Sequence, residues 1–172
     1  MKALILVADG FEELTVFLPW YRLREEGVDV RLASPLMHVL TGEHDYRVEP
    51  DTTIHEVNPA EYDLLLIPDG PCGERLRVRE EAVDVARTFM QEGMRVAAIG
   101  HGLQLLISAG ALDGRRVTCC PGIRDDVRAA GANYRDEAVV LDGNLITARG
   151  PDDLPAFARA LVRALNGARL VA

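Results

Sequence analysis

Hydrophobic residues along this chain form short continuous runs that alternate with segments of helical spacing. A continuous apolar run such as 2–7 or 62–67 is typical of a strand buried on both faces of a sheet. In 13–26, by contrast, apolar positions recur with the spacing of one helix face. On these patterns we expect strands at 2–7, 28–33, 62–67, 96–99, 117–120, 138–141 and 145–148. We expect helices at 13–26, at 80–92, after the turn at 100–102 until Gly110 stops it, at 123–130, and from 151 to about Asn166.

This alternation predicts a single α/β domain over residues 1–172. Repeated strand–helix units place helices on both faces of a mostly parallel sheet, which is a three-layer sandwich. Residues 35–59 are polar with two β-favouring patches, so we expect a hairpin or a small insertion at the sheet edge. Asp142-Gly143-Asn144 lies between two apolar runs and predicts that the last two strands form a hairpin.

Composition and charge argue against a membrane-spanning protein and against a protein that mainly binds nucleic acid. The 172 residues are 48% hydrophobic and 27% charged, as in an ordinary soluble domain. No apolar run approaches the roughly 20 residues that span a bilayer, and the first run resembles a core strand more than a signal peptide. The net charge of −8 argues against nucleic acid as the main partner. Three cysteines without zinc-site spacing favour a reducing, cytoplasmic setting.

Three polar loops follow expected strands and hold the candidate chemistry. They are Ala8-Asp9-Gly10-Phe11-Glu12-Glu13, Pro68-Asp69-Gly70-Pro71-Cys72-Gly73-Glu74-Arg75 and Gly100-His101-Gly102. Ligands of open parallel sheets bind beyond the carboxyl ends of the strands. If the three strands are neighbours, Glu12, Gly70 and His101 meet in one crevice.

Each of these residues has a chemical and a structural interpretation. Glu12 could act as an acid or a base in a desolvated crevice, or it could simply stabilise a helix N-terminus. His101 could move protons or serve as a structural hydrogen-bonding residue. The backbone N–H groups of Gly70 and His101 could together form an oxyanion hole or a small anion site.

Gly100 is the unusual residue of the third loop. Many hydrolases present their nucleophile at a tight strand-to-helix turn of this kind, but glycine has no side chain to present. The loop is not a dinucleotide fingerprint either, because Leu105 stands at the third glycine position. We therefore expect no cofactor, and a turn shaped like a catalytic elbow without its nucleophile.

Taken together, these loops resemble the ThiJ/PfpI family, and specifically its intracellular protease branch. The resemblance extends over essentially the whole chain. It is carried by Ala8-Asp9-Gly10-Phe11-Glu12-Glu13, Pro68 with Gly70, Gly73-Glu74-Arg75, Ala97-Ala98-Ile99-Gly100-His101-Gly102, Gln104-Leu105-Leu106-Ile107-Ser108-Ala109-Gly110, Pro121-Gly122-Ile123-Arg124-Asp125-Asp126 and Asp142-Gly143-Asn144.

The resemblance implies a flavodoxin-like sandwich that assembles into dimers or hexamers. Activities reported in the family include peptidase, glyoxalase without metal or cofactor, deglycase and chaperone functions. It also implies a reactive cysteine at the position of Gly100, supported by the residues matching Glu12 and His101. In the protease branch, an acid of a neighbouring subunit that matches Glu74 can complete the site.

Three positions depart from the pattern that the resemblance implies. Gly100 removes the nucleophile, Asp69 stands where the family usually has a second glycine, and Cys120 stands where protease-branch members often have a tyrosine. The first hypothesis is therefore an enzyme with altered or reduced hydrolase or lyase chemistry on small carbonyl compounds or peptides. Glu12 and His101 would handle protons in such an enzyme.

A replacement nucleophile would have to be another thiol. Cys120 and Cys72 are candidates, because His101 or Arg75 beside a thiol could lower its pKa; Cys72 and Arg75 are also the expected substrate contacts. Either cysteine could equally be an ordinary packing residue. Two alternatives are a non-catalytic, oligomeric ligand-binding or chaperone-like protein, and an engineered Gly100 variant of an active cysteine enzyme.

Two other classes are set aside. A class I glutamine amidotransferase needs a catalytic histidine far downstream of the elbow, and His101 is the last histidine in the chain. A metal site built from Glu12, His101 and nearby cysteines has no known ligand spacing, so we expect no metal.

Overall fold

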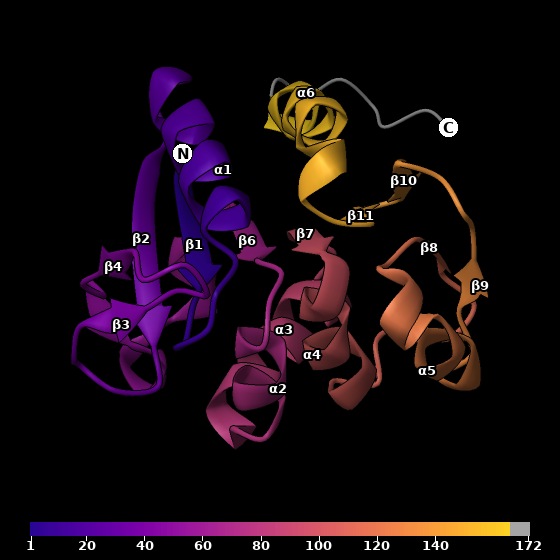
Figure 1. Ribbon diagram of the computed structural model, residues 1–172, viewed down its shortest axis with the longest axis horizontal. Coiled ribbons are helices and arrows are strands. Elements are labelled where there is room, and N and C mark those ends of the chain that lie inside the picture. Colours follow the sequence, from indigo (N-terminus) through magenta and orange to yellow (C-terminus); the bar gives the residue numbers. More distant parts are fainter. Residues whose placement is uncertain (166–172) are drawn as a thin grey trace.

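A seven-stranded sheet forms the centre of the computed structural model, which describes residues 1–165 (Figure 1). Its strand order is β10-β11-β7-β6-β1-β2-β5, and every neighbouring pair is parallel except β10 with β11. The strands are β1 (Lys2–Leu6), β2 (Asp29–Ser34), β5 (Thr52–Thr53), β6 (Leu64–Ile67), β7 (Arg95–Ile99), β10 (Val139–Asp142) and β11 (Leu145–Ala148).

Helices cover both faces of this sheet, which gives the expected flavodoxin-like three-layer sandwich. Figure 1 shows α1 and α6 on one face and α2, α3 and α4 on the other, with α5 beside them. The helices are α1 (Glu13–Glu25), α2 (Cys72–Arg77), α3 (Glu80–Gln91), α4 (Leu103–Ser108), α5 (Arg124–Ala129) and α6 (Leu154–Leu165). The predicted fold class is confirmed.

The central strands are buried on both sides, as their continuous apolar runs predict. Every residue of Leu64–Ile67 is buried, and Ala3 to Leu6 and Val96 to Ile99 are 0% exposed. Burial of this kind stabilises a strand by roughly 25 cal/mol per Å² of apolar surface removed from water. The core therefore holds β1, β6 and β7 rigidly, and their carboxyl ends make a fixed base for the loops that follow.

The predicted edge insertion at 35–59 forms a short hairpin and the edge strand β5. The hairpin pairs β3 (Leu40–Thr41) with β4 (Arg47–Val48). It is held over the first loop because Gly10 N–H donates to the Thr41 carbonyl at 2.8 Å and Glu43 N–H donates to the Phe11 carbonyl at 3.0 Å.

Three details of the sequence prediction need correction. The strand expected at 117–120 is limited to β8 (Arg116–Val117), which pairs with β9 (Asn133–Tyr134) outside the main sheet. The six-residue helix α2 was not expected, because its segment is too short to show a period. The final helix begins near the predicted position, and its expected last residue, Asn166, lies outside the described residues.

None of the helices described between residues 1 and 165 has the length and apolar character needed to cross a membrane.

Candidate functional site

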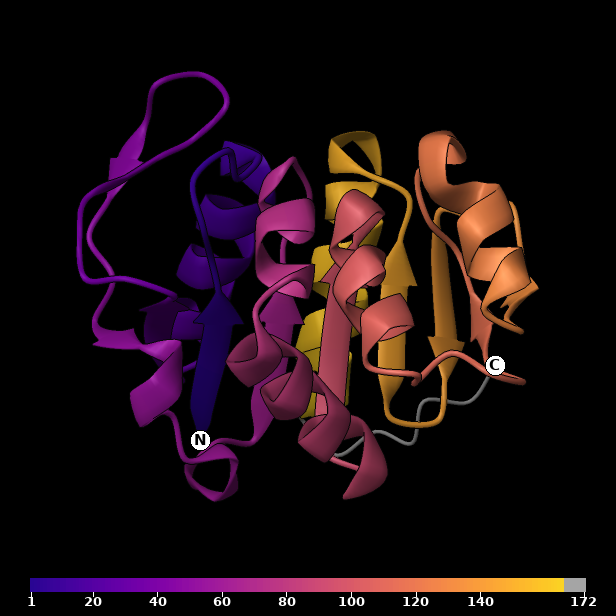
Figure 2. The same ribbon diagram turned by 90° about the horizontal axis from the view of Figure 1, so that it is seen from below.

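The three loops singled out in the sequence meet at the carboxyl edge of the sheet, since β1, β6 and β7 are adjacent. Figure 2 shows these strands running side by side, with the hairpin segment near the end of β1. A pocket of about 440 Å³ opens there, and we call it the acidic pocket. It is lined by Glu12, Glu43, Asp69, Gly70, Pro71, Glu74, His101 and Pro151.

Glu12 lies at the start of α1 and is 7% exposed. Its carboxylate accepts hydrogen bonds from Leu14 N–H at 3.3 Å and Thr15 N–H at 2.8 Å. Glu12 therefore caps the N-terminus of α1, and the same side chain also lines the acidic pocket.

Gly70 brings the second loop into direct contact with the first. Its φ is +104°, and a β-carbon at this position would lie 2.5 Å from the Gly10 carbonyl oxygen and 2.7 Å from Glu12 N. Only glycine fits such an approach of two backbones. The close packing fixes the Gly70 N–H at the floor of the pocket.

The Asp69 carboxylate fills the predicted anion site. Its Oδ1 accepts hydrogen bonds from the N–H of Gly70 at 2.7 Å and from the N–H of His101 at 2.7 Å. These are the two donors expected to form an oxyanion hole, so the site exists but an acid of the same chain occupies it. The Asp69 side chain is only 10% exposed.

Gly100 lies directly against this carboxylate. Its φ is +51°, a left-handed conformation that favours glycine. A β-carbon at Gly100 would overlap the Asp69 Cγ and both carboxylate oxygens. The volume in which an elbow side chain would begin is therefore occupied by Asp69.

His101 is held as a cation by its neighbours. Its Nδ1 lies 2.9 Å from Asp69 Oδ1 and 3.5 Å from Cys120 Sγ. The hydrogen bond with Asp69, followed by that with Cys120, raises the pKa of His101 to about 10. The ring is therefore an imidazolium at neutral pH, and it donates hydrogen bonds more readily than it accepts a proton.

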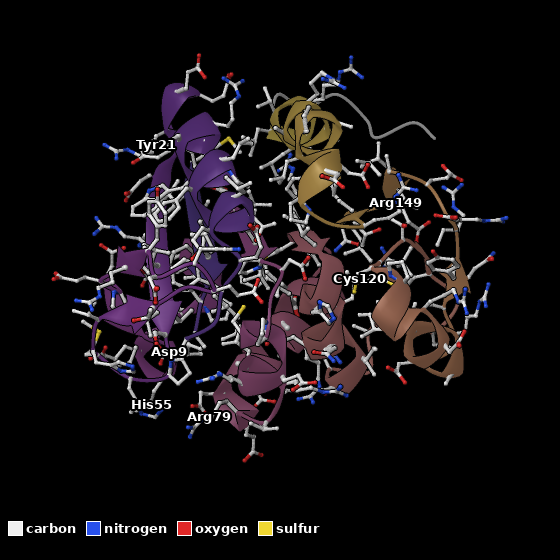
Figure 3. All side chains as sticks on the ribbon, viewed as in Figure 1. Asp9, Tyr21, His55, Arg79, Cys120 and Arg149 are labelled. Carbon is white, nitrogen blue, oxygen red and sulfur yellow. The ribbon has the colours of Figure 1, made fainter. Side chains whose placement is uncertain are left out.

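Cys120 lies close to His101, as predicted, but does not line the acidic pocket. Figure 3 shows it between α4 and α5, and it is partly buried. In a Cys–His–Asp triad, thiol and acid use different ring nitrogens, whereas here Cys120 and Asp69 both contact Nδ1. The thiol is near an imidazolium, but the arrangement lacks a free base to activate it.

Cys72 and Arg75, the expected substrate contacts, lie outside the lining of the acidic pocket. Cys72 is 0% exposed, and burial, together with the charge of Asp69, raises the pKa of its thiol far above the ordinary value. Arg75 points to a neighbouring pocket of about 220 Å³ that also contains Asp9 and Arg79, which are labelled in Figure 3. Neither residue lines the acidic pocket, because α2 turns Cys72 inward and Arg75 towards the neighbouring pocket, so their contact with a ligand stays a prediction.

Glu74 lines the acidic pocket of its own chain. The resemblance implied that the matching acid comes from a neighbouring subunit. Here α2 places Glu74 at the rim of the pocket formed by the same polypeptide.

Two charged residues of the acidic pocket, Asp69 and Glu43, were not predicted as site residues from the sequence. Asp69 was noted as a departure, but without a role. Glu43 lies on the hairpin, and burial, followed by the charges of Asp69 and Glu12, raises the pKa of its carboxyl group. Its distance along the chain from the three loops concealed it, because no local pattern shows that the hairpin folds over the first loop.

One group of described residues has ligand atoms close enough to hold a metal ion. Atoms of Glu12, Glu13 and His44 lie within 4.8 Å of one another. These atoms are already engaged, since Glu12 caps α1 and Glu13 bonds to the His44 ring at 2.7 Å. We therefore assign no metal to this group.

Comparison with known proteins shows to which family this chain belongs. Residues 1–164 match the sequence pattern of the DJ-1/PfpI family. The chain belongs to the DJ-1/PfpI family. It is 48% identical over 166 residues to the protein named Deglycase PfpI of Pyrococcus furiosus, covering 96% of this chain and 100% of that protein. It is 40% identical over 170 residues to Protein/nucleic acid deglycase 2 of Escherichia coli, covering 96% and 98% of the two chains.

Solved structures of DJ-1/PfpI proteins share the fold. A ThiJ/PfpI domain protein from Brachyspira murdochii superimposes with a TM-score of 0.90 at 26% identity, covering 96% of this chain and 95% of that one. A two-domain protein from Anabaena variabilis, with DJ-1/ThiJ/PfpI-like and ferritin-like domains, gives 0.95 at 33% identity. This chain corresponds to 48% of that longer protein, and the match covers 97% of this chain.

Proposed function

We propose that this DJ-1/PfpI-family protein performs thiol-independent proton-transfer chemistry, of the lyase or hydrolase type, on small carbonyl compounds or peptides. The observation that carries the proposal is the composition of the acidic pocket. It contains four carboxylates and an imidazolium, and the lining identified among residues 1–165 includes no cysteine. Names of the relatives as deglycases support enzyme chemistry at this site.

The two predicted proton-handling groups have separate roles in this proposal. Glu12 accepts a proton from the substrate, or from a water molecule that attacks a peptide, and later returns it. The imidazolium of His101 donates a hydrogen bond to the substrate carbonyl oxygen. Its Nδ1 contacts Asp69 and Cys120, so we assign this task to Nε2–H, which lies 3.7 Å from where a β-carbon of Gly122 would stand. A cationic donor polarises a carbonyl because negative charge develops on the oxygen in the transition state.

The charge of the pocket indicates which carbonyl compounds fit. Glu12, Glu43, Asp69 and Glu74 repel anionic ligands. Neutral methylglyoxal should therefore be used in preference to pyruvate, which is of similar size but carries a carboxylate. A reversed preference would argue that the carboxylates do not face the substrate.

The test is an assay of four proteins, the parent chain and three variants, on methylglyoxal and pyruvate. Glu12→Gln should reduce kcat by about 10²-fold or more, the usual contribution of a general acid or base. Cys120→Ser and Glu49→Gln, the latter an exposed carboxylate outside the pocket, should stay within about twofold of the parent chain. Loss of turnover in Cys120→Ser would instead assign the reaction to a relocated thiol.

A non-catalytic binding role is the second candidate, favoured by one observation. The anion site is already filled by Asp69, so the groups that would stabilise a reaction intermediate are engaged at rest. Binding of methylglyoxal without any turnover in the parent chain would support this role and remove the first proposal.

Self-association and cellular setting complete the proposal. We propose a dimer or hexamer in a reducing, cytoplasmic setting, consistent with three free cysteines. Light scattering at several protein concentrations tests the assembly, and a strictly monomeric protein would contradict it.

A further inference from the structure

The Asp69 carboxylate lies where the β-carbon of a side chain at position 100 would stand. The same carboxylate accepts the N–H groups of Gly70 and His101, which would otherwise bind an anion. We infer that Asp69 and Gly100 form one interdependent pair: the Asp69 carboxylate fills an anion site of its own chain, and glycine at position 100 leaves room for it. When Asp69 is removed, this site accepts a small carboxylate from solution. The inference concerns the pocket of the proposed function, but it does not require that the parent chain turn over any substrate.

Space is the first argument for this pair. Any side chain at Gly100 would collide with three atoms of the Asp69 carboxylate. The Asp69 backbone is fixed, since its N–H donates to the Thr15 hydroxyl at 3.1 Å and its carbonyl accepts from Glu12 N–H at 2.9 Å. The carboxylate could leave the Gly100 β-carbon position only by rotating off the N–H groups of Gly70 and His101. Glycine at position 100 is therefore what allows Asp69 to stay on these two donors.

Hydrogen bonding is the second argument. Oδ1 of Asp69 accepts from Gly70 N–H, from His101 N–H and from the His101 ring, at 2.7, 2.7 and 2.9 Å. Three donors converging on one oxygen, one of them cationic, make a site built for a carboxylate. Removing Asp69 would leave all three donors without this partner.

The ligand class follows from the shape of the missing group. Exchange of Asp69 for glycine removes one methylene and one carboxylate. Acetate restores both, its methyl group standing where the Asp69 β-carbon lay. The site of the Asp69→Gly variant should therefore take small monocarboxylates, with acetate as the matched probe.

Acetate binding is tested by thermal unfolding. Sodium acetate should raise the Tm of Asp69→Gly by at least about 2 °C over sodium chloride at equal ionic strength, and should leave the parent unchanged. Asp9→Gly is the control, because Asp9 also accepts a backbone N–H, from Thr41 at 2.9 Å, but at a more exposed position. Equal shifts in both variants, or none in Asp69→Gly, would overturn the inference.

The same geometry predicts how a thiol behaves at position 100. Gly100→Cys alone should lose stability and alkylate slowly, because the new β-carbon meets Asp69. Asp69→Gly with Gly100→Cys removes the collision and opens the two N–H donors. Its thiol should react with iodoacetamide about tenfold faster or more, since the thiolate can accept the backbone N–H groups of Gly70 and His101 that Asp69 no longer occupies.

Intact-protein mass measurement of alkylation at pH 7 gives the rates, in a Cys120→Ser background that removes the competing thiol. Asp69→Asn with Gly100→Cys is the matched control, because asparagine retains the bulk of Asp69, and this variant should remain slow. Fast alkylation and parental stability in Gly100→Cys alone would refute the interdependence. These outcomes are separate from the proposed function, which is tested by Glu12→Gln in a chain that retains Gly100.

Discussion

Two histidine–carboxylate pairs lie at this end of the molecule and are built in the same way. His101 donates its backbone N–H and its ring to Asp69, at 2.7 and 2.9 Å. His44 donates its backbone N–H and its ring to Glu13, at 2.5 and 2.7 Å. Both carboxylates are buried, and each pair raises the pKa of its histidine.

The difference between the pairs lies in what surrounds them. The His44 ring is 71% exposed, and its pair attaches the hairpin to the start of α1. The Asp69–His101 pair also receives the Gly70 N–H and fills the anion site of the elbow. The same contact therefore serves as a structural tie in one place and as an occupant of a functional site in the other. The neighbouring donors decide which role it has.

The largest effect is expected from Asp69→Asn, which keeps the shape of the side chain and removes its charge. Weakening of a buried pair with three donors should lower the free energy of unfolding by roughly 2–3 kcal/mol. The pKa of His101 should fall towards its ordinary value. Urea denaturation and an NMR titration of the ring measure the two effects. An unchanged His101 titration would show that Asp69 does not hold the imidazolium.

The pH dependence of stability should follow the same pair. His101 has an ordinary pKa of 6.5 and a folded pKa of about 10. Its contribution to stability is therefore fully present below pH 6.5 and is lost as the pH rises towards 10. Urea midpoints between pH 6 and 10 test this decline. Asp69→Asn should flatten the curve, and an equally steep decline in that variant would assign it to other groups.

A smaller effect is expected from Glu13→Gln. The buried carboxylate would lose its charge-assisted bonds to His44, which should lower the free energy of unfolding by roughly 1–2 kcal/mol. Hydrogen exchange should increase within residues 40–48 and remain unchanged at the elbow. Glu49→Gln, an exposed change on the same segment, is the control. Faster exchange at His101 in Glu13→Gln would mean that the two pairs are coupled.

The smallest effect is expected from His44→Gln. Its exposed ring gains little from the ion pair, and the backbone N–H still reaches Glu13, so the free energy of unfolding should change by about 0.5 kcal/mol or less. Chemical denaturation measures it against the parent. If His44→Gln lowered the free energy of unfolding as much as Glu13→Gln does, the ion pair of the His44 ring would be the main stabilising contact.

Much of the fold could be predicted because it depends on long buried runs. The runs at 2–7, 62–67 and 96–99 became adjacent strands, and the convergence of their loops followed from parallel topology. Helix α2 could not be predicted, since six residues after a glycine–proline turn carry no period. Its direction decides that Cys72 and Arg75 lie outside the lining of the acidic pocket, which the sequence does not show.

The sequence predicted the hydrogen-bond donors of the anion site but not the carboxylate that fills it. The N–H groups of Gly70 and His101 were expected at one anion site, and the structure brings them to one oxygen. Asp69 and Gly100 were each recognised as unusual. That they compete for one volume depends on backbone angles and a three-dimensional distance, neither of which a linear sequence contains.

The collision at Gly100 also restricts the mutational paths open to a lineage. If an ancestor of this chain carried cysteine at position 100 and glycine at position 69, an exchange that began with Asp69 would have placed a carboxylate against the cysteine β-carbon. An exchange that began with Gly100 would have left only an open space and two unfilled donors. The second path avoids the clash. On that path the cysteine would have been lost first, and the Asp69 carboxylate would have entered a site that already lacked its nucleophile.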